Sequence, residues 1–597
     1  MSESISNERL SKRNLWGYSM GGIGRDMAYQ LVNTYLLTFI TFTKGLSNTE
    51  FAMVGVIMVI CRIFDGCNDP FMGSVIEITR TKIGKFKPWI LAGVFTNVAV
   101  IIALFCVPLR GTSYLIFFAF GYLLWGMTYT MNDISYWGMM PSLSSNPNDR
   151  NNLATLANIG AGVGAGLSVL AIPSLTQGNL AIAPNASKSY AIVSIIVCIL
   201  FFACQIMTVL VVKEKPLPKV RVDDGEKRSL KEMFRVIFKN DQLKPVMAAM
   251  LLYSIGSGIT MALASYWIYY RFAYQGLLVT LFTVISGIST VVIVFFPILC
   301  KKHSRRWISK LSMIMIIVGY LLMFIISLAT GADPKADKVG FKVGEVFIPV
   351  TFIFTGLSGA CAFFGQTLFY QVLTISVANT VEYNEYTTGM RDEGVIFACR
   401  PFTTKLGSAA VVGITTLVVL ALGLNPTNKA ISNADYEAGQ LAVQVEQLVK
   451  DETPNFDSLS KEEQTKLIDS KKKSIETENV AKIENIIHTN EDTKVAKWQY
   501  QTMFAFMTLL PLVILLGSFA IYFKKYNISE ERYDEICAEI AKRKLAAEGN
   551  AEVVLDGADV NELENDLASS DAETPDEIFE QEAAADKISK APDEVEK

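Results

Sequence analysis

The chain has 597 residues, of which 51% are hydrophobic and 19% are charged, and its formal net charge is −4. Soluble domains carry about 25% charged residues, whereas here the apolar residues form blocks of about 20 or more, the length that crosses a bilayer. The composition therefore excludes a soluble globular protein and predicts an all-α, multi-pass membrane protein. The nine cysteines lie mostly inside the apolar blocks, which argues against a disulfide framework and a zinc site.

Twelve apolar segments are expected to cross the membrane, and the loops between them alternate in charge. Lys and Arg gather in residues 80–87, 213–239 and 301–306, whereas the loops on the opposite side hold few basic residues. Because basic loops stay on the cytoplasmic side, both termini are predicted to be cytoplasmic. The expected spans are residues 16–42, 51–77, 88–109, 113–140, 152–176, 188–212, 243–271, 277–300, 307–329, 347–378, 394–423 and 499–523.

A long basic connection divides the spans into two groups of six. It predicts two six-helix bundles, residues 1–213 and 242–524, joined by a cytoplasmic linker at 214–241. Residues 425–497 form a polar insert, predicted to be extracellular and helical, with a capping-box pattern of Ser-Lys-Glu-Glu. Residues 525–597 form a cytoplasmic tail that begins amphipathic and then becomes strongly acidic.

Glycine recurs at every second position in the fifth span, at Gly160, Gly162, Gly164 and Gly166. Small residues allow neighbouring helices in a membrane to approach closely. We therefore interpret these glycines as packing residues of the fifth span.

A charged stretch interrupts the second span. Arg62, Asp65 and Asp69 recur at i, i+3 and i+7, so they lie on one face of the helix. An ionisable side chain inside a membrane helix costs roughly 2.5–3.5 kcal/mol, and two carboxylates one turn apart repel each other. A positive charge must therefore lie between them. Asn68 and Thr130 add oxygen atoms that suit Na⁺ or Li⁺, and a proton on a carboxylate is the alternative.

A second polar set lies in the first and fourth spans. Asp26 follows Arg25 directly, and Tyr129, Asp133 and Trp137 follow one another at intervals of one helical turn. Carboxylates and a guanidinium group bind hydroxyl groups, and an aromatic ring adds a flat apolar platform. The set predicts a site for a hydroxyl-rich ligand such as a sugar, although Trp137 taken alone fits a packing role equally well.

The charges inside the spans do not balance. Four acids stand against Arg25, Arg62 and Lys405, so a cavity that holds all seven lacks one positive charge, which a monovalent cation would supply. The alternative is that the acids pair with Arg62 and its neighbours only to lock helices together, but buried pairs seldom add stability. His303 and His488 lie outside the spans, which excludes a histidine proton relay and argues against an enzyme.

Several short motifs stand out along the chain: Arg62-Ile63-Phe64-Asp65, Asn68-Asp69-Pro70, residues 79–89, residues 125–133, Val381-Glu382-Tyr383 and Gly389-Met390-Arg391-Asp392-Glu393. Together they resemble the glycoside–pentoside–hexuronide cation symporter family, of which the melibiose permeases are the best-known branch. The resemblance implies a major facilitator fold and cation-coupled sugar uptake by alternating access. It implies no cofactor other than the coupling ion, which is Na⁺, Li⁺ or H⁺.

The resemblance also implies roles for individual residues. The cation site corresponds to Asp65, Asp69, Asn68 and Thr130. The sugar site corresponds to Arg25, Asp26, Tyr129, Asp133, Trp137, Asn158, Tyr370 and Lys405. Arg62 and Arg391 are expected to have a structural or gating role.

Two positions depart from the melibiose-type pattern. Asn158 stands where that branch has a sugar-contacting arginine, which puts α-galactoside specificity in doubt. Arg400-Pro401 looks more like the lactose-type branch, and Lys405 matches the lysine that bridges the two bundles. The insert at residues 425–497 is an addition to the family pattern.

We therefore expect a monomeric secondary transporter of the plasma membrane that imports an oligosaccharide or glycoside with Na⁺ or H⁺, without a nucleic-acid partner. Cation binding would neutralise Asp65 and Asp69 and favour sugar binding. A transporter-like sugar sensor that signals through the insert or the tail is the alternative. A lipid or drug exporter of the same fold is disfavoured by the polar set around Asp26 and Asp133.

Overall fold

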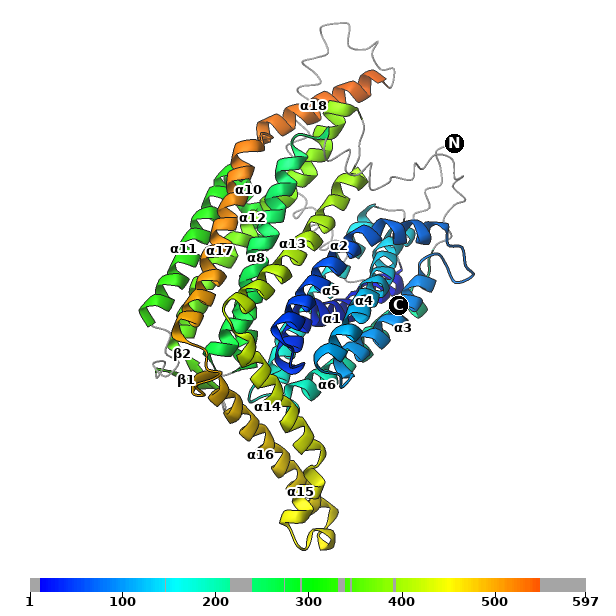
Figure 1. The fold of residues 1–597 in the computed structure, drawn as a ribbon. Helices are drawn as coiled ribbons and strands as arrows, with labels where there is room; N and C mark the ends of the chain where they lie inside the picture. The colour runs from blue at the N-terminus through cyan, green and yellow to red at the C-terminus, as the bar shows by residue number, and fades with distance from the viewer. Residues whose placement is uncertain are drawn as a thin grey trace, which may run out of the picture. The chain divides into compact units, whose positions relative to one another are not determined.

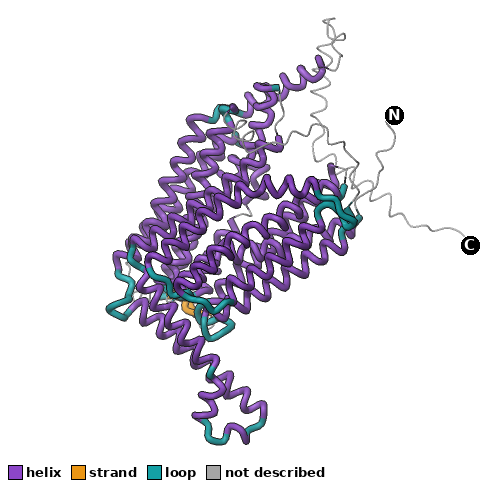
Figure 2. Tube along the Cα trace, turned by 45° about the vertical axis from the view of Figure 1, so that its right-hand side comes forward, coloured by secondary structure: helices purple, strands orange, loops and turns teal. Residues whose placement is uncertain are grey.

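The computed structural model describes residues 11–144, 147–214, 239–272, 274–289, 292–330, 339–343, 346–389 and 393–547, and these are mostly helical (Figure 1, Figure 2). The amino-terminal helices are α1 (Lys12–Thr43), α2 (Asn48–Ile78), α3 (Lys87–Cys106), α4 (Gly111–Met139), α5 (Pro147–Thr176) and α6 (Ala186–Val211). The carboxy-terminal helices are α8 (Leu243–Arg271), α9 (Gly276–Ile288), α10 (Val292–Lys302), α11 (Arg305–Thr330), α12 (Val350–Thr388), α13 (Glu393–Ala421) and α17 (Lys497–Lys525). A short antiparallel hairpin pairs β1 (Gly340–Val343) with β2 (Val346–Pro349).

Nine helices in the described part of the chain are long and apolar enough to cross a membrane: α3, α4, α5, α6, α8, α11, α12, α13 and α17. Helices α1 and α2 are as long, but their polar and charged side chains lower their hydropathy. The expected eighth span covers α9 and α10, and residues 290 and 291 between them lie outside the described residues. The predicted count of twelve is consistent with this set.

The amino-terminal helices pack around α1, which contacts α5 and α6, while α4 packs against α2 and α3. Among the carboxy-terminal helices, α8 packs against α13 and α17. Two helix pairs join the two sets, since α2 lies along α13 and α5 lies along α9. The α2–α13 pair is the one that carries charged side chains, so it positions the site described below.

Two of the four glycines of α5 are packing residues, as the sequence predicted. A Cβ atom on Gly160 would meet the carbonyl oxygen of Ser19, and one on Gly164 would meet that of Ile23. Gly162 and Gly166 have no heavy atom within 4 Å of an added Cβ. The close approach of α5 to the backbone of α1 therefore depends on Gly160 and Gly164.

Substituting alanine at Gly164 is expected to destabilise the protein by about 1–3 kcal/mol, because the methyl group collides with a backbone oxygen that cannot turn away. The melting temperature of the detergent-solubilised protein measures this. Gly162→Ala and Gly166→Ala are matched controls on the same helix and should leave the melting temperature unchanged or slightly higher. Equal losses for all three variants would contradict the packing argument.

The insert between α13 and α17 is helical, as predicted. It consists of α14 (Asn425–Val443), α15 (Val445–Glu452) and α16 (Lys461–His488), and α14 packs against α16 (Figure 1). Ser460 and Glu463 form the predicted capping box at the start of α16, where each side chain bonds the other residue's backbone N–H. The insert also has a small apolar core: Ala438, Val445, Val449, Phe456 and Ile475.

The insert binds the ends of the amino-terminal helices. Asp435 accepts hydrogen bonds from the backbone N–H groups of Ala186 and Ser187, so it caps the start of α6. Arg110, just before α4, donates to the carbonyl and hydroxyl oxygens of Ser432 at 3.0 and 2.9 Å. These polar contacts fasten α14 to helices that precede it by more than 200 residues in the chain.

Residues 382–391 and 528–597 make up a separate small unit. Its described part contains α18 (Glu530–Ala547), and the guanidinium groups of Arg532 and Arg543 both lie over the ring of Tyr386. The acidic part of the predicted tail lies outside the described residues.

Candidate functional site

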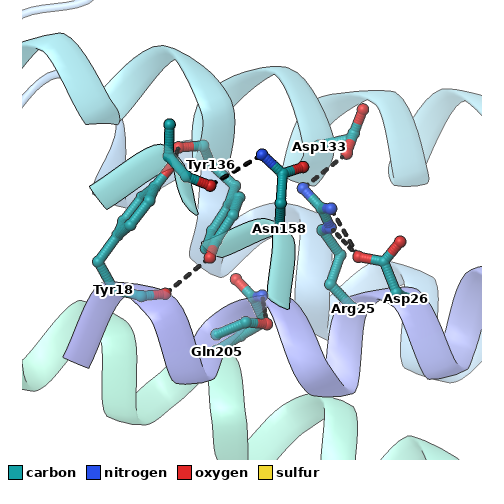
Figure 3. A network of polar contacts seen from close by, with 9 residues as sticks. Tyr18, Arg25, Asp26, Asp133, Tyr136, Asn158 and Gln205 are labelled. Atoms are coloured by element: carbon teal, nitrogen blue, oxygen red, sulfur yellow. Dashed lines mark hydrogen bonds and ion pairs between the residues drawn. The ribbon is translucent and has the colours of Figure 1, made fainter. Parts of the chain in front are cut away.

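A buried arginine joins two carboxylates at the centre of the amino-terminal helices. The Arg25 Nη2 atom lies 2.6 Å from Asp26 Oδ2, and Nη1 lies 2.9 Å from Asp133 Oδ1 on α4 (Figure 3). The Arg25 side chain is only 3% exposed, and its guanidinium group also lies 4.8 Å from the ring of Trp137. One positive charge thus serves two negative charges, and we call Arg25, Asp26 and Asp133 the arginine triad.

Paired tyrosines hold α1 against α4 beside this triad. The Tyr18 hydroxyl donates to the carbonyl of Tyr136 at 2.9 Å, and the Tyr136 hydroxyl donates to that of Tyr18 at 2.7 Å (Figure 3). Their rings stack with centroids 4.5 Å apart, and Gln205 of α6 donates to the carbonyl of Gly21. These bonds fix the backbone of α1 at Tyr18 and Gly21, in the helical turn that precedes Arg25.

A lysine joins the other two carboxylates. Lys405 of α13 places its Nζ atom 3.0 Å from Asp65 Oδ2 and 2.6 Å from Asp69 Oδ2, both on α2. The Thr130 hydroxyl of α4 donates to Asp65 Oδ1 at 2.8 Å and lies 3.4 Å from Asp69 Oδ1. We call Lys405, Asp65 and Asp69 the lysine triad, and it carries one uncompensated negative charge, as the arginine triad does.

Among the described residues Arg62 forms no ion pair with these acids, so the part of the alternative in which Arg62 itself locks them was wrong. Its Nε atom donates to the Tyr122 hydroxyl at 2.9 Å, and Nη2 donates to Asn33 Oδ1. A helical side chain leans toward the amino terminus of its own helix, which carries the Arg62 guanidinium away from Asp65. The positive charge that the acids require comes instead from another helix.

Both triads border one cavity of about 320 Å³, which we call the charged cavity. Its lining residues come from α1, α2, α4, α5 and α13, and aromatic rings form part of the wall. They are Arg25, Asp26, Tyr29, Asp65, Trp125, Gly126, Tyr129, Thr130, Asp133, Trp137, Asn158, Ala161 and Lys405. The cavity therefore combines carboxylates, one guanidinium, one ammonium and flat apolar surfaces, the groups that bind a hydroxylated ligand and a small cation.

The sequence profile of a family described as MFS/sugar transport protein matches residues 17–442. The chain belongs to this family. Members of the MFS/sugar transport protein family are transporters and not enzymes, and the match confirms both the resemblance found in the sequence and the predicted all-α membrane fold.

The names of several relatives include a sugar. The raffinose carrier protein of Pediococcus pentosaceus is 26% identical over 437 residues, which cover 71% of this chain and 64% of the relative. The lactose permease of Lactobacillus delbrueckii subsp. bulgaricus is 28% identical over 422 residues, covering 68% and 63%. The isoprimeverose transporter of Lactiplantibacillus pentosus is 26% identical over 417 residues, covering 68% and 80%. The chain thus spans less than two thirds of the first two relatives.

Most residues that the sequence selected in this MFS/sugar transport protein meet in the charged cavity. Asn158 lines it, although its amide donates to the Ala154 carbonyl of its own helix at 2.8 Å (Figure 3). Neither Asn68 nor Asp69 is among its lining residues, although Asp69 Oδ2 lies 2.6 Å from Lys405 Nζ, which does line it. Tyr370 lines a neighbouring cavity instead, and Arg391 lies outside the described residues.

Sequence reasoning missed two aromatic residues that line the charged cavity, Tyr29 and Trp125. The ring of Trp125 stacks on those of Tyr29 and Tyr129, with centroids 6.3 and 5.8 Å apart. Trp125 and Tyr129 are one helical turn apart on α4, and this i, i+4 aromatic spacing was the available signal.

Proposed function

We propose that this chain is a secondary active transporter that imports a sugar, either an oligosaccharide or a glycoside, together with Na⁺ or H⁺. The observation that carries the proposal is the pair of triads on one cavity, each of which is one positive charge short. The printed names of the relatives, a raffinose carrier protein, a lactose permease and an isoprimeverose transporter, support a sugar as cargo.

The lysine triad is the proposed cation site. Asp65 and Asp69 offer carboxylate oxygens and Thr130 a hydroxyl oxygen, which are ligands that Na⁺ and Li⁺ prefer, and a proton would neutralise the same acids. An arriving ion competes with the ammonium group of Lys405, which already lies between the carboxylates. Binding therefore weakens a link between α2 and α13, the helices that join the two sets, and this gives the ion control over their relative motion.

The arginine triad is the proposed sugar site. Asp26 and Asp133 accept hydrogen bonds from sugar hydroxyl groups, Arg25 donates to them, and Trp137 covers the apolar face of the ring. A cation at the lysine triad reduces the negative charge of the shared cavity and so favours the ligand beside it. By linkage the sugar tightens cation binding by the same factor, which makes the two cargoes move together.

The proposed setting is the plasma membrane, with both termini in the cytoplasm and the insert outside. Residues 1–213 and 242–524 act as two bundles that rock about the cavity between them, with residues 214–241 as their cytoplasmic link. The protein works as a monomer and needs no cofactor apart from the coupling ion.

Uptake by proteoliposomes that contain the purified full chain tests this proposal. Radiolabelled lactose, melibiose and raffinose are offered under an imposed Na⁺ gradient and, separately, under a pH gradient. At least one sugar should accumulate above its outside concentration under one gradient, and an ionophore should abolish the accumulation. Deleting residues 548–597 should leave uptake intact. Uptake no faster than into protein-free liposomes under both gradients would overturn the proposal.

A further inference from the structure

A second cavity lies beside the charged cavity, displaced toward the insert. It has a volume of about 390 Å³ and is lined by α1, α2, α8, α9, α12 and α13. On α2, Arg62 lines the second cavity, whereas Asp65, one turn further along, lines the charged cavity. On α13, Thr404 lines the second cavity, whereas Lys405 lines the charged cavity. The two cavities therefore border each other along the same helices.

Hydroxyl groups dominate the second cavity, which we call the hydroxyl cavity. Thirteen of its 21 lining residues are Ser, Thr or Tyr, and Arg62 is the single charged residue among them. Arg62 already donates to Tyr122 and Asn33. The described lining thus holds no carboxylate to attract a cation and no free guanidinium to attract an anion, so it suits a neutral molecule that carries hydroxyl groups.

One hydroxyl group in this cavity lacks a protein partner. Thr415 of α13 is 1% exposed, and its Oγ1 atom has no hydrogen bond to any residue that the structure describes. The neighbouring Thr416, which does not line the cavity, donates to the Val412 carbonyl at 2.9 Å. A buried polar atom without a partner is unfavourable, so the Thr415 hydroxyl favours a ligand that supplies the missing hydrogen bond.

The hydroxyl cavity also has a flat aromatic wall. The rings of Tyr253 on α8 and Tyr370 on α12 stack with centroids 5.4 Å apart and planes 27° apart. Arg400 donates to the Tyr370 hydroxyl at 2.7 Å and so fixes that ring. Aromatic faces beside hydroxyl groups bind the two kinds of surface that a sugar ring presents.

We propose that the hydroxyl cavity is a second glycosyl subsite, and that the cargo is a neutral saccharide of at least two rings. One ring lies at Asp26 and Asp133 in the charged cavity, and the rest of the saccharide extends along the hydroxyl cavity between Tyr370 and Thr415. On α1 the hydroxyl cavity begins at Asn33, about 10 Å beyond Asp26 at a rise of 1.5 Å per residue, which is farther than one sugar ring reaches. This inference rests on the proposed function and adds the length of the cargo to it.

Binding of sugars of increasing length to the purified full chain tests the second subsite. One series is methyl α-galactoside, melibiose and raffinose, which share a galactosyl end and have one, two and three rings; the other is methyl β-galactoside and lactose. In the series that binds, the second ring should tighten binding at least tenfold. Ser257→Phe fills the cavity from α8, so it should weaken binding of two-ring sugars at least tenfold and leave the one-ring glycoside within twofold.

Two threonines give a matched pair that does not depend on a bulky substitution. Thr415→Val keeps the shape of the side chain and should weaken two-ring sugars about threefold, while Thr416→Val should change nothing. Equal affinity of wild type for one-ring and two-ring sugars, or equal weakening of both by Ser257→Phe, would overturn the subsite alone. If wild type binds no sugar of either series, the proposed function fails and the subsite fails with it.

Discussion

Asp69→Asn is expected to abolish accumulation of sugar against a gradient. Lys405 Nζ lies between Asp65 and Asp69, so removing one carboxylate leaves a balanced lysine–aspartate pair with no demand for a further cation. Losing one partner of a partly buried ion costs roughly 3 kcal/mol, which corresponds to about a 100-fold loss of cation affinity. Sugar uptake in proteoliposomes, with and without the cation gradient, measures the effect. Facilitated movement down the sugar gradient should persist.

Asn68→Ala is the matched control for this prediction. Asn68 precedes Asp69 on α2 and was a predicted ligand, but among the described residues it makes no contact with Lys405 or Thr130, both of which Asp69 meets. Accumulation by Asn68→Ala should therefore stay within about twofold of wild type. The corresponding free-energy change is well below the value of about 1.4 kcal/mol that a tenfold effect requires. Accumulation that survives Asp69→Asn and fails in Asn68→Ala would show that the cation binds on another face of α2.

Arg25→Gln is expected to abolish sugar binding and to lower stability at the same time. The substitution leaves Asp26 and Asp133 as two partly buried acids without the guanidinium group that joins them. Breaking such a contact costs about 3–5 kcal/mol, so sugar affinity should fall at least 100-fold and the melting temperature should drop. Arg25→Lys should restore the charge but only part of the affinity, because an ammonium group lacks the planar fork that meets two carboxylates.

A double substitution separates the two effects of Arg25→Gln. Adding Asp133→Asn returns the net charge of the arginine triad to its wild-type value of one negative charge. The melting temperature should therefore recover, while sugar binding should not, because both the donor and one acceptor for the sugar are gone. Recovery of sugar binding in the double variant would show that Arg25 acts only on stability.

The sequence predicted which acids matter but not how they are neutralised. Spacing placed Asp65 and Asp69 on one face of α2, and the structure brings both to one ammonium group. Their partner lies 336 residues from Asp69 in the chain, and no periodicity within α2 can select it. The count of charges inside the spans included Lys405, and the family resemblance gave it as a sugar-site residue that bridges the two bundles, whereas local spacing offered Arg62, whose side chain leans the other way.

The hydroxyl cavity had no signature in the sequence. Its polar residues are spread over six helices, and each looks like an ordinary hydroxyl group of a membrane helix; Ser257 and Ser408, for example, bond the backbone of their own helix. Thr415 differs from Thr416 only in the direction that the side chain faces. Such a site exists only after the helices have packed. The same holds for Asp435, whose hydrogen-bond partners are the residues that begin α6.

The insert connects the carboxy-terminal helices to the amino-terminal helices through hydrogen bonds of α14. Three residues separate the end of α13 from the start of α14. Polar side chains of α14 nevertheless bind the loop before α4 and the start of α6. Under the proposed function, a conformation that separates the two sets of helices on this face must first break these hydrogen bonds, so the insert would raise the free energy of that opening. In the proposed orientation, an antibody fragment that holds α14 against Arg110 would inhibit transport from outside the cell without contacting the charged cavity.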